Sequence, residues 1–137
     1  MSTPRGIRNC NPLNIERNAT KWQGLRPQQT DERFCQFISM EYGYRAAFRT
    51  LLTYTKQYKL HTIREWISRW APPKENDTAK YIRVVCSRAK LDADTPINIY
   101  DKEKMVAVVS AMAFMENGID AVREEVLSGF EMAFVYG

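Results

Sequence analysis

From Ser39 onward, apolar residues recur every three or four positions, the period of an amphipathic helix. The first such stretch predicts a helix of roughly residues 41–59, with Ser39 as its N-cap and Glu41 in its first turn, where the helix dipole favours a carboxylate. A capping box formed by residues 62–65 begins a second, shorter helix. The proline pair at 72–73 ends it, because proline cannot continue a helix.

Three more helices are expected downstream. The third starts near residue 76 or 77 and carries apolar residues at helical spacing as far as Ala89. The fourth, residues 101–117, is apolar nearly all round and is therefore predicted to be central, with Gly118 as the glycine that closes it. The last helix carries its apolar stripe between residues 119 and 134.

The first 38 residues have a different pattern. Residues 13–17 alternate apolar and polar side chains, and residues 33–38 are aromatic and compatible with a strand. Residues 18–32 between them are polar and suit a long hairpin loop. The sequence therefore predicts an α+β fold, mainly α: a single domain over 1–137 with a small β-ribbon in 1–38 and about five helices in 39–137.

Length and composition support one globular domain. The chain has 137 residues, of which 45% are hydrophobic and 26% are charged. Its longest apolar stretch, residues 105–115, is shorter than the roughly 20 residues that span a membrane, so no membrane span is expected. The first residues lack the apolar core of a signal peptide, so none is predicted.

Charge and metal-binding residue types narrow the function further. The net charge of +4 permits loose attraction to nucleic acid or to cell-wall glycan and requires neither. Three cysteines and one histidine, without ligand spacing, exclude the usual zinc sites and any catalytic pair that needs a second histidine. No metal and no cofactor are expected, and carboxylate chemistry remains.

Acid catalysis on a glycan needs a carboxyl group that stays protonated near neutral pH, which an apolar pocket provides. Glu41 has the most apolar neighbours of any acid and falls where the ribbon meets the first long helix, although a simple helix N-terminal carboxylate has the same pattern. Glu75 lies in a polar loop that suits substrate binding or a second-carboxylate role, with loop ordering as the alternative. For Glu16, a salt bridge is the simpler explanation.

Aromatic and basic residues leave alternatives open. Trp66 and Trp70 share a helical stripe and are predicted to be core residues. Trp22, in a polar segment, is equally consistent with a sugar-stacking platform and with a lid over the core. The first quarter of the chain is basic, but no recognised nucleic-acid module accompanies it, so nucleic acid is not favoured as a partner.

An ordered set of motifs resembles a family of phage and prophage virion structural proteins, the P-five type. The family opens on Arg-Gly-Ile-Arg-Asn-Asn-Asn-Pro-Gly-Asn-Ile, which residues 5–15 match except at Cys10, where the family usually has Asn, and at Leu13, where it has Gly. If that glycine has a positive φ, a leucine there would be strained. The other matching stretches are 22–24, 34–37, 41–46 and 70–82.

The family in turn is similar, more distantly, to lysozyme-like peptidoglycan glycosidases and bacterial glucosaminidases. This resemblance implies a lysozyme-like domain with a glycan cleft lined by Asn11, Asn14, Trp22 and Tyr81. In glucosaminidases the catalytic glutamate precedes the Asn block by a helix, whereas no acid precedes it here. Either the acid has moved, or the activity is lost and a binding module remains.

The expected function is a virion-associated protein that binds or cleaves peptidoglycan glycan strands, as a muramidase or lytic transglycosylase. Its general acid would be Glu41, with Glu75 next, and Glu75, Asn76 and Thr78 would position the sugar. The alternatives are a non-catalytic virion structural protein, held by contacts with other virion proteins, and a nucleic-acid-binding module. The expected location is the virion, or the bacterial cytoplasm when the protein is made from a prophage.

Overall fold

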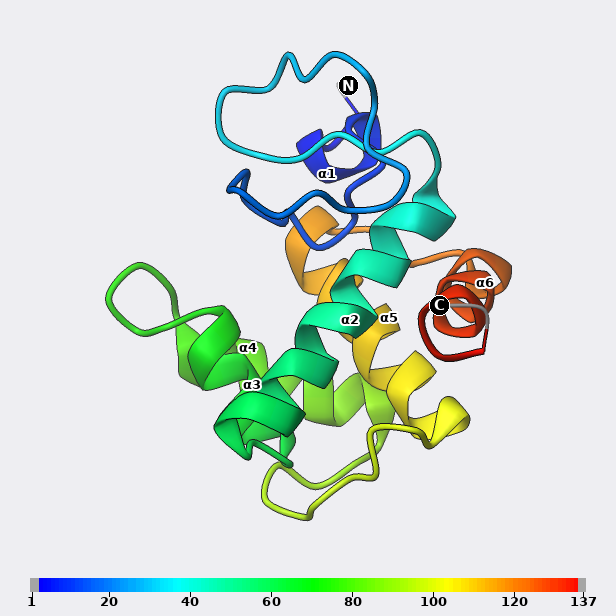
Figure 1. The fold of residues 1–137 in the computed structure, drawn as a ribbon. Helices are drawn as coiled ribbons and strands as arrows, with labels where there is room; N and C mark the ends of the chain where they lie inside the picture. The colour runs from blue at the N-terminus through cyan, green and yellow to red at the C-terminus, as the bar shows by residue number, and fades with distance from the viewer. Residues whose placement is uncertain (1–2, 136–137) are drawn as a thin grey trace.

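The computed structural model describes residues 3–135 and contains six α-helices (Figure 1). They are α1 (Arg5–Arg8), α2 (Met40–Tyr58), α3 (Ile63–Trp70), α4 (Thr78–Ala89), α5 (Lys102–Asn117) and α6 (Arg123–Phe134). The five predicted helices are all present, and α1 adds a short turn that the sequence pattern did not predict.

The predicted β-ribbon is wrong, and with it the α+β fold class, because residues 3–135 contain helices and no strand. The two predicted strand segments do lie side by side: Arg17 N donates to Arg33 O at 2.8 Å, and Cys35 N donates to Ile15 O at 2.9 Å. Their pairing stops at one isolated bridge, between Glu16 and Phe34. A ladder would need the alternation of hydrogen bonds to continue along both segments.

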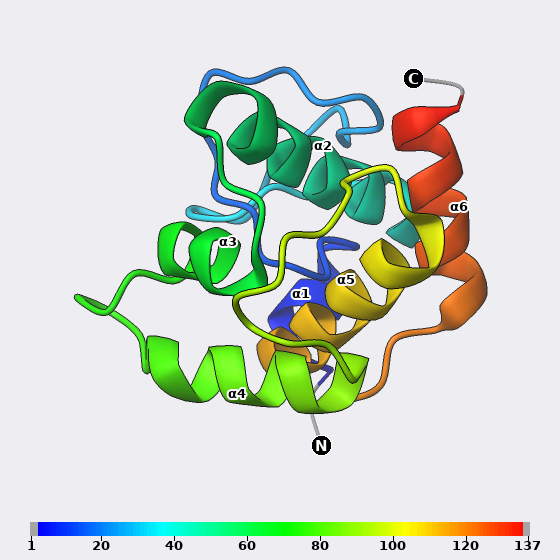
Figure 2. The same ribbon diagram turned by 90° about the horizontal axis from the view of Figure 1, so that it is seen from below.

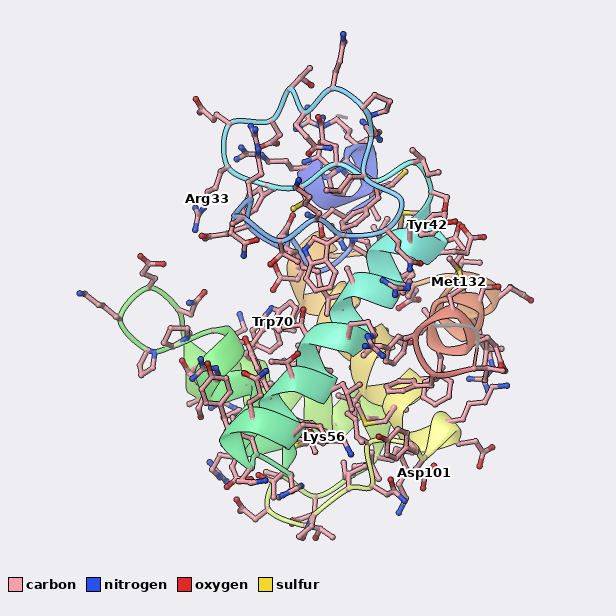
Figure 3. The ribbon with its side chains drawn as sticks, viewed as in Figure 1. Arg33, Tyr42, Lys56, Trp70, Asp101 and Met132 are labelled. Atoms are coloured by element: carbon pink, nitrogen blue, oxygen red, sulfur yellow. The ribbon has the colours of Figure 1, made fainter. Side chains whose placement is uncertain are left out.

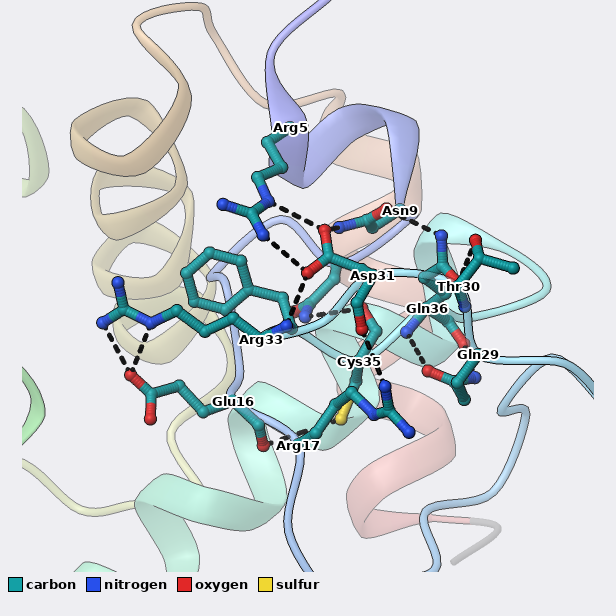
Figure 4. Close-up of polar contacts among 12 residues, drawn as sticks. Arg5, Asn9, Glu16, Arg17, Gln29, Thr30, Asp31, Arg33, Cys35 and Gln36 are labelled. Carbon is teal, nitrogen blue, oxygen red and sulfur yellow. Dashed lines mark hydrogen bonds and ion pairs between the residues drawn. The ribbon is translucent and has the colours of Figure 1, made fainter.

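Side chains take over the hydrogen bonds that a ladder would have made. The fully buried Asn11 accepts from Ile15 N and donates to the carbonyls of Ile15 and Cys35, at 2.9 Å each. The Gln29 side chain binds the backbone of Gln36 in the same way: its Nε2 donates to Gln36 O at 2.8 Å, and its Oε1 accepts from Gln36 N at 2.7 Å (Figure 4). Because each buried backbone group needs one partner, these side chains satisfy the segment without a sheet.

Asp31 is the centre of this network (Figure 4). Its carboxylate accepts from the Arg5 guanidinium at 2.7 Å, from Asn9 Nδ2 at 2.9 Å, and from the backbone N–H groups of Arg33 and Phe34. The hydrogen bond from Arg5 and the backbone donors, against the opposing effect of burial, hold the Asp31 pKa far below its usual value. The carboxylate therefore stays ionised and fastens α1 to the loop.

The predicted caps of α2, α3 and α5 are confirmed, whereas α6 begins at Arg123, after Ile119 and Val122 of the predicted stripe. Ser39 caps α2 by accepting from Tyr42 N, and Thr62 and Glu65 form the reciprocal capping box of α3. Gly118 closes α5 with φ 72°, a conformation that glycine adopts without a steric penalty. These signals depend on neighbours within four residues, which explains why the sequence carries them.

The core is built around α5, which contacts α1, α2, α4 and α6. Figure 2 shows it running between α4 on one side and α2 and α6 on the other. Its buried side chains, including Met105, Val109 and Met112, account for the apolar pattern that predicted a central helix. Between residues 3 and 135, no helix combines the length and apolar character that crossing a bilayer requires.

Candidate functional site

A groove separates the N-terminal loop segment, residues 9–39 between α1 and α2, from helices α2 and α3. It consists of two cavities that share Asn14, Glu16 and Trp70 in their walls. The first, the aromatic cavity, has a volume of about 370 Å³ and is walled by Trp22, Tyr54 and Trp70. The second, the acidic cavity, has a volume of about 700 Å³, and its walls include the carboxylates Glu16, Glu75 and Glu116.

Helix α3 and the loop segment provide opposite walls of the groove. Trp70 is the last residue of α3 and is half-buried, and Arg33 reaches the acidic cavity from the loop segment (Figure 3). The prediction that both helical tryptophans are core residues is confirmed for Trp66, which is fully buried, and holds in part for Trp70, which packs against the core and also lines the groove. Residues on the same helical stripe are not equally buried here, because α3 ends with Trp70 at the groove.

Glu116 is the most enclosed carboxylate of the groove. It lies in the last turn of α5, and its side chain is half-buried in the wall of the acidic cavity. Asn14 Nδ2 donates to its Oε1 at 2.9 Å, and the Tyr81 hydroxyl donates to its Oε2 at 2.9 Å. Loop segment, α4 and α5 thus meet at one carboxyl group.

The surroundings of Glu116 raise its pKa. Burial is the largest cause, and the hydrogen bonds from Asn14 and Tyr81 and the interaction with Trp70 only partly oppose it. The C-terminal end of a helix also disfavours negative charge, which acts in the same direction as burial. A carboxyl group with a raised pKa in a solvent-accessible cavity is the arrangement that general acid catalysis needs.

The Tyr81 hydroxyl is bound into the same arrangement. Its ring is buried, and its pKa is raised well above the usual value because burial and the neighbouring Glu116 disfavour a phenolate. The phenol therefore stays protonated and keeps donating to Oε2. Tyr81 holds the carboxyl group from behind and does not line either cavity of the groove.

Glu116 is not among the site residues predicted from the sequence. It falls inside the helix predicted as apolar and central, whereas the predicted acids lie in a loop and at a helix start. The available signal was that Glu116 is the one acid between Met105 and Asn117, in the turn next to the closing Gly118. An acid at the end of a buried helix must reach either solvent or a cleft.

Four of the predicted site residues border the groove. Asn14 and Trp22 line the aromatic cavity, and Asn14 also lines the acidic cavity. Glu75 and Asn76, in the exposed loop between α3 and α4, line the acidic cavity. Asn76 donates from Nδ2 to Pro72 O, which orders this loop.

Two residues predicted to bind substrate instead use their side chains in hydrogen bonds to the backbone. Asn11 is fully buried and uses both ends of its amide on backbone groups. Thr78 is buried, and its hydroxyl donates to Ala71 O, which joins the start of α4 to the end of α3. Neither side chain lines the groove.

Glu41, the predicted general acid, lies outside the groove. It is half-buried in the first turn of α2 and does not line either cavity of the groove. Its neighbour is Glu125 in α6, whose pKa is raised by burial and then by the charges of Glu41 and Glu124. Its position therefore fits the alternative of a helix N-terminal carboxylate.

The basic residues of the first quarter are mostly used inside the chain. Arg5 pairs with Asp31, and Arg33 pairs with Glu16 at 2.8 Å. Arg26 donates to the carbonyls of Phe37 and Arg8, which closes the loop segment. Guanidinium groups bound to internal carboxylates and carbonyls have fewer donors left for phosphates, which weakens the nucleic-acid interpretation.

Within residues 3–135 the structure brings together no group of three or more His, Cys, Asp or Glu side chains suited to a metal ion. The cysteines Cys10, Cys35 and Cys86 are free thiols. Burial raises the thiol pKa of Cys35 and of Cys86, which makes both poor nucleophiles.

Comparison with known proteins shows a clear similarity to a phage protein. Protein P5 of Pseudoalteromonas phage PM2 is 39% identical over 137 residues, a match that covers 97% of this chain and 83% of that protein. No protein-family model matches the sequence.

Proposed function

Because the chain belongs to the family of protein P5 of Pseudoalteromonas phage PM2, and is thus a phage protein, we propose that it is virion-associated and cleaves peptidoglycan glycan strands. The single observation that carries the proposal is Glu116, a half-buried carboxyl group with a raised pKa in the wall of a groove. Peptidoglycan is the glycan that a phage meets when it enters a bacterial cell.

The composition of the groove supports a carbohydrate ligand. Trp22, Tyr54 and Trp70 give the aromatic cavity ring faces on which sugar rings stack. The acidic cavity is more polar, with Asn14 and Asn76 as amide partners for hydroxyl and acetamido groups. Because the cavities are adjacent and share Asn14, Glu16 and Trp70 in their walls, we expect a chain of sugars bound in one to extend into the other.

The proposed reaction needs one carboxyl group. Protonated Glu116 donates its proton to the glycosidic oxygen, and the bond from that oxygen to the sugar C1 breaks. The carboxylate then accepts the proton of the 6-hydroxyl group of the same sugar, whose oxygen bonds to C1. The products are a free hydroxyl end and a 1,6-anhydro end, as in a lytic transglycosylase.

Glu16 and Glu75 line the acidic cavity as well, and either provides a second carboxylate for a hydrolytic version of the reaction. In that version a water molecule, activated by the second carboxylate, attacks C1 and gives a reducing end. Glu75 and Asn76 also lie where they would contact the sugar at the mouth of the acidic cavity. The two versions differ in their products.

The decisive experiment is the release of soluble muropeptides from purified peptidoglycan, with products identified by mass spectrometry. Glu116→Gln is expected to lower release at least 100-fold, because an amide has no proton to donate at neutral pH. Glu41→Gln is the matched control, since Glu41 is also a half-buried helical glutamate but lies outside the groove. Its release is expected to stay within about twofold of wild type.

Anhydro ends that disappear with Glu116→Gln would support a lytic transglycosylase, and reducing ends that disappear with it would support a hydrolase. Loss of release in Glu41→Gln instead would contradict the assignment of Glu116. A folded wild-type protein that releases nothing from any wall type would contradict catalysis and favour a non-catalytic virion protein.

A further inference from the structure

Gly6, in the middle of α1, packs directly behind the residues that hold Glu116. It is buried, and a Cβ built on it would lie 2.5 Å from Asn117 Oδ1 and 3.0 Å from Asn14 Oδ1. It would also lie 2.9 Å from the backbone oxygen of Asn11. Three oxygens therefore surround the space that a side chain would take.

The two amides are held firmly in this position. Asn117 donates from Nδ2 to Pro12 O at 2.8 Å and to Ala113 O at 3.0 Å. The Asn14 backbone has φ 52°, and its N–H donates to Asn11 O at 3.0 Å. The Oδ1 atoms of both amides are buried without a hydrogen-bond partner.

The direction of the Asn14 amide determines a contact to Glu116. With Oδ1 toward Gly6, the other end of the amide, Nδ2, donates to Glu116 Oε1. A buried oxygen without a hydrogen-bond partner costs free energy, so the environment of Oδ1 does not favour this orientation of the amide. The contact with Glu116 on one side and the glycine on the other fix it.

We propose that Gly6 is a positioning residue for Glu116: its lack of a side chain lets Asn14 turn its amide N–H groups toward the carboxyl group. The effect of Gly6 on the Asn14–Glu116 contact does not depend on any activity, whereas its importance for catalysis rests on the proposed function. Gly6 itself contacts neither the groove nor Glu116, and it acts through Asn14.

An alanine at position 6 would force the two amides apart. Its Cβ would lie 2.5 Å from Asn117 Oδ1 and 3.0 Å from Asn14 Oδ1, and the backbone oxygen of Asn11 at 2.9 Å limits its movement away from them. Asn14 would then turn, and Nδ2 would lose its hydrogen bond to Oε1. Removing a donor from the charged form of a carboxyl group raises its pKa.

The other groups around Glu116 are not among the nearest neighbours of a Cβ at position 6 and are expected to keep their places. They are the Tyr81 hydroxyl from α4 and Trp70 from α3, with the charged Glu16, Arg33 and Glu75 on the walls of the same cavity. A change in the Glu116 pKa that Asn14→Ala reproduces would therefore report the loss of the Asn14 contact.

The test is an NMR titration of the Glu116 side-chain carboxyl carbon in the full chain, for wild type and Gly6→Ala. The pKa of Glu116 is expected to rise by about 0.5–1 in Gly6→Ala, the effect of one lost hydrogen bond to a carboxylate. The matched control is Gly129→Ala: Gly129 is also a buried helical glycine whose Cβ would lie 2.5 Å from a neighbour, Tyr44 Cβ, but it packs between α6 and α2. The Glu116 pKa is expected to be unchanged there.

A second variant, Asn14→Ala, covers the case in which Gly6→Ala does not fold, because it removes the amide without adding volume. It is expected to raise the Glu116 pKa in the same direction. An unchanged pKa in Asn14→Ala, or in folded Gly6→Ala, would overturn the proposal.

Muropeptide release against pH separates this inference from the proposed function. If both are right, the upper pH limit of release shifts upward in Gly6→Ala together with the Glu116 pKa. If wild type releases nothing, the proposed function fails, and the titration still decides whether Gly6 positions Glu116.

Discussion

Cys10 and Asn14 both have left-handed backbone, with φ 50° and φ 52°. Asparagine tolerates this conformation better than most residues, whereas cysteine gains nothing from it. The family motif that residues 5–15 resemble has an asparagine at position 10, and asparagine fits the positive φ found there. Leu13, the other departure from that motif, is fully buried and is not among the residues with positive φ, so the strain considered for it does not arise.

Cys10→Asn is therefore expected to stabilise the protein by about 0.5 kcal/mol, because the new residue fits the backbone conformation already present. Chemical denaturation of the two proteins measures the difference. Cys86→Asn is the control: Cys86 is in the interior of α4, where asparagine is a poor helix former, and the substitution should destabilise. Equal effects at both positions would contradict the argument from φ.

Glu116 should make the stability of the protein depend on pH. Its pKa in the folded chain is raised above the ordinary 4.5, so the folded state binds the proton more tightly than the unfolded state. This contribution to stability is complete below about pH 4.5 and is lost as the pH rises through the folded-state pKa.

Glu116→Gln removes this dependence. The Tm of the variant minus that of wild type is expected to grow as the pH increases from 4 to 8, measured by thermal denaturation. Glu75→Gln, in the exposed loop before α4, controls for the loss of one negative charge. A difference that stays constant across this range would show that burial does not raise the pKa of Glu116.

At the scale of elements, α2 and α6 pack closely because a glycine lies between them. A Cβ on Gly129 would lie 2.5 Å from Tyr44 Cβ and 3.0 Å from Arg45 N, both in α2. Gly129→Ala is expected to destabilise the protein by about 1–3 kcal/mol, because backbone atoms in a packed core cannot yield. Denaturant unfolding measures this, with Ser128→Ala, the half-buried neighbour in α6, expected to change stability by less than about 0.5 kcal/mol.

The loop segment is an element of another kind, ordered by polar side chains rather than by regular structure. Asp31 binds Arg5, Asn9 and two backbone N–H groups, and its side chain is only 9% exposed. This network sets the distance between α1 and the loop, and therefore the position of the groove wall that carries Arg33.

At the scale of the whole molecule, the proposed function predicts that the rate of cleavage depends on the length of the glycan. Glu116 lies in the acidic cavity, and Trp22 in the aromatic cavity beyond the shared Trp70. If the groove binds glycan as proposed, oligomers long enough to reach Trp22 are expected to bind more tightly than shorter ones. In Trp22→Ala, kcat/KM for long oligomers is expected to fall about tenfold, the loss of one stacking contact, while short oligomers are unaffected.

Steady-state rates on glycan oligomers of increasing length check this prediction. Tyr100→Ala is the control, since Tyr100 is an exposed aromatic residue outside both cavities. An equal loss for short and long oligomers in Trp22→Ala would show that the tryptophan supports the fold and not the substrate.

The sequence pointed to those residues of the candidate groove whose signal is local. Trp22 was recognisable as a tryptophan without periodic partners, and it lines the groove. Asn14 and Tyr81 were named through the family resemblance, and both bind Glu116. Glu116 itself was missed, because a single acid in an apolar helix does not reveal whether a cavity lies beside it.

The sequence by itself determined the helices, since their period and caps depend on residues within four positions of each other, as Thr62 and Glu65 illustrate. Only the tertiary structure decided the site. Glu116 forms hydrogen bonds with Tyr81, which is 35 positions away in the chain, and with Asn14, which is 102 positions away. No local pattern encodes such pairs. The same holds for the loop segment, where long-range side-chain hydrogen bonds prevailed over the strands that alternation favoured. Local propensity is a small free energy, and packing and buried hydrogen bonds exceed it wherever they disagree.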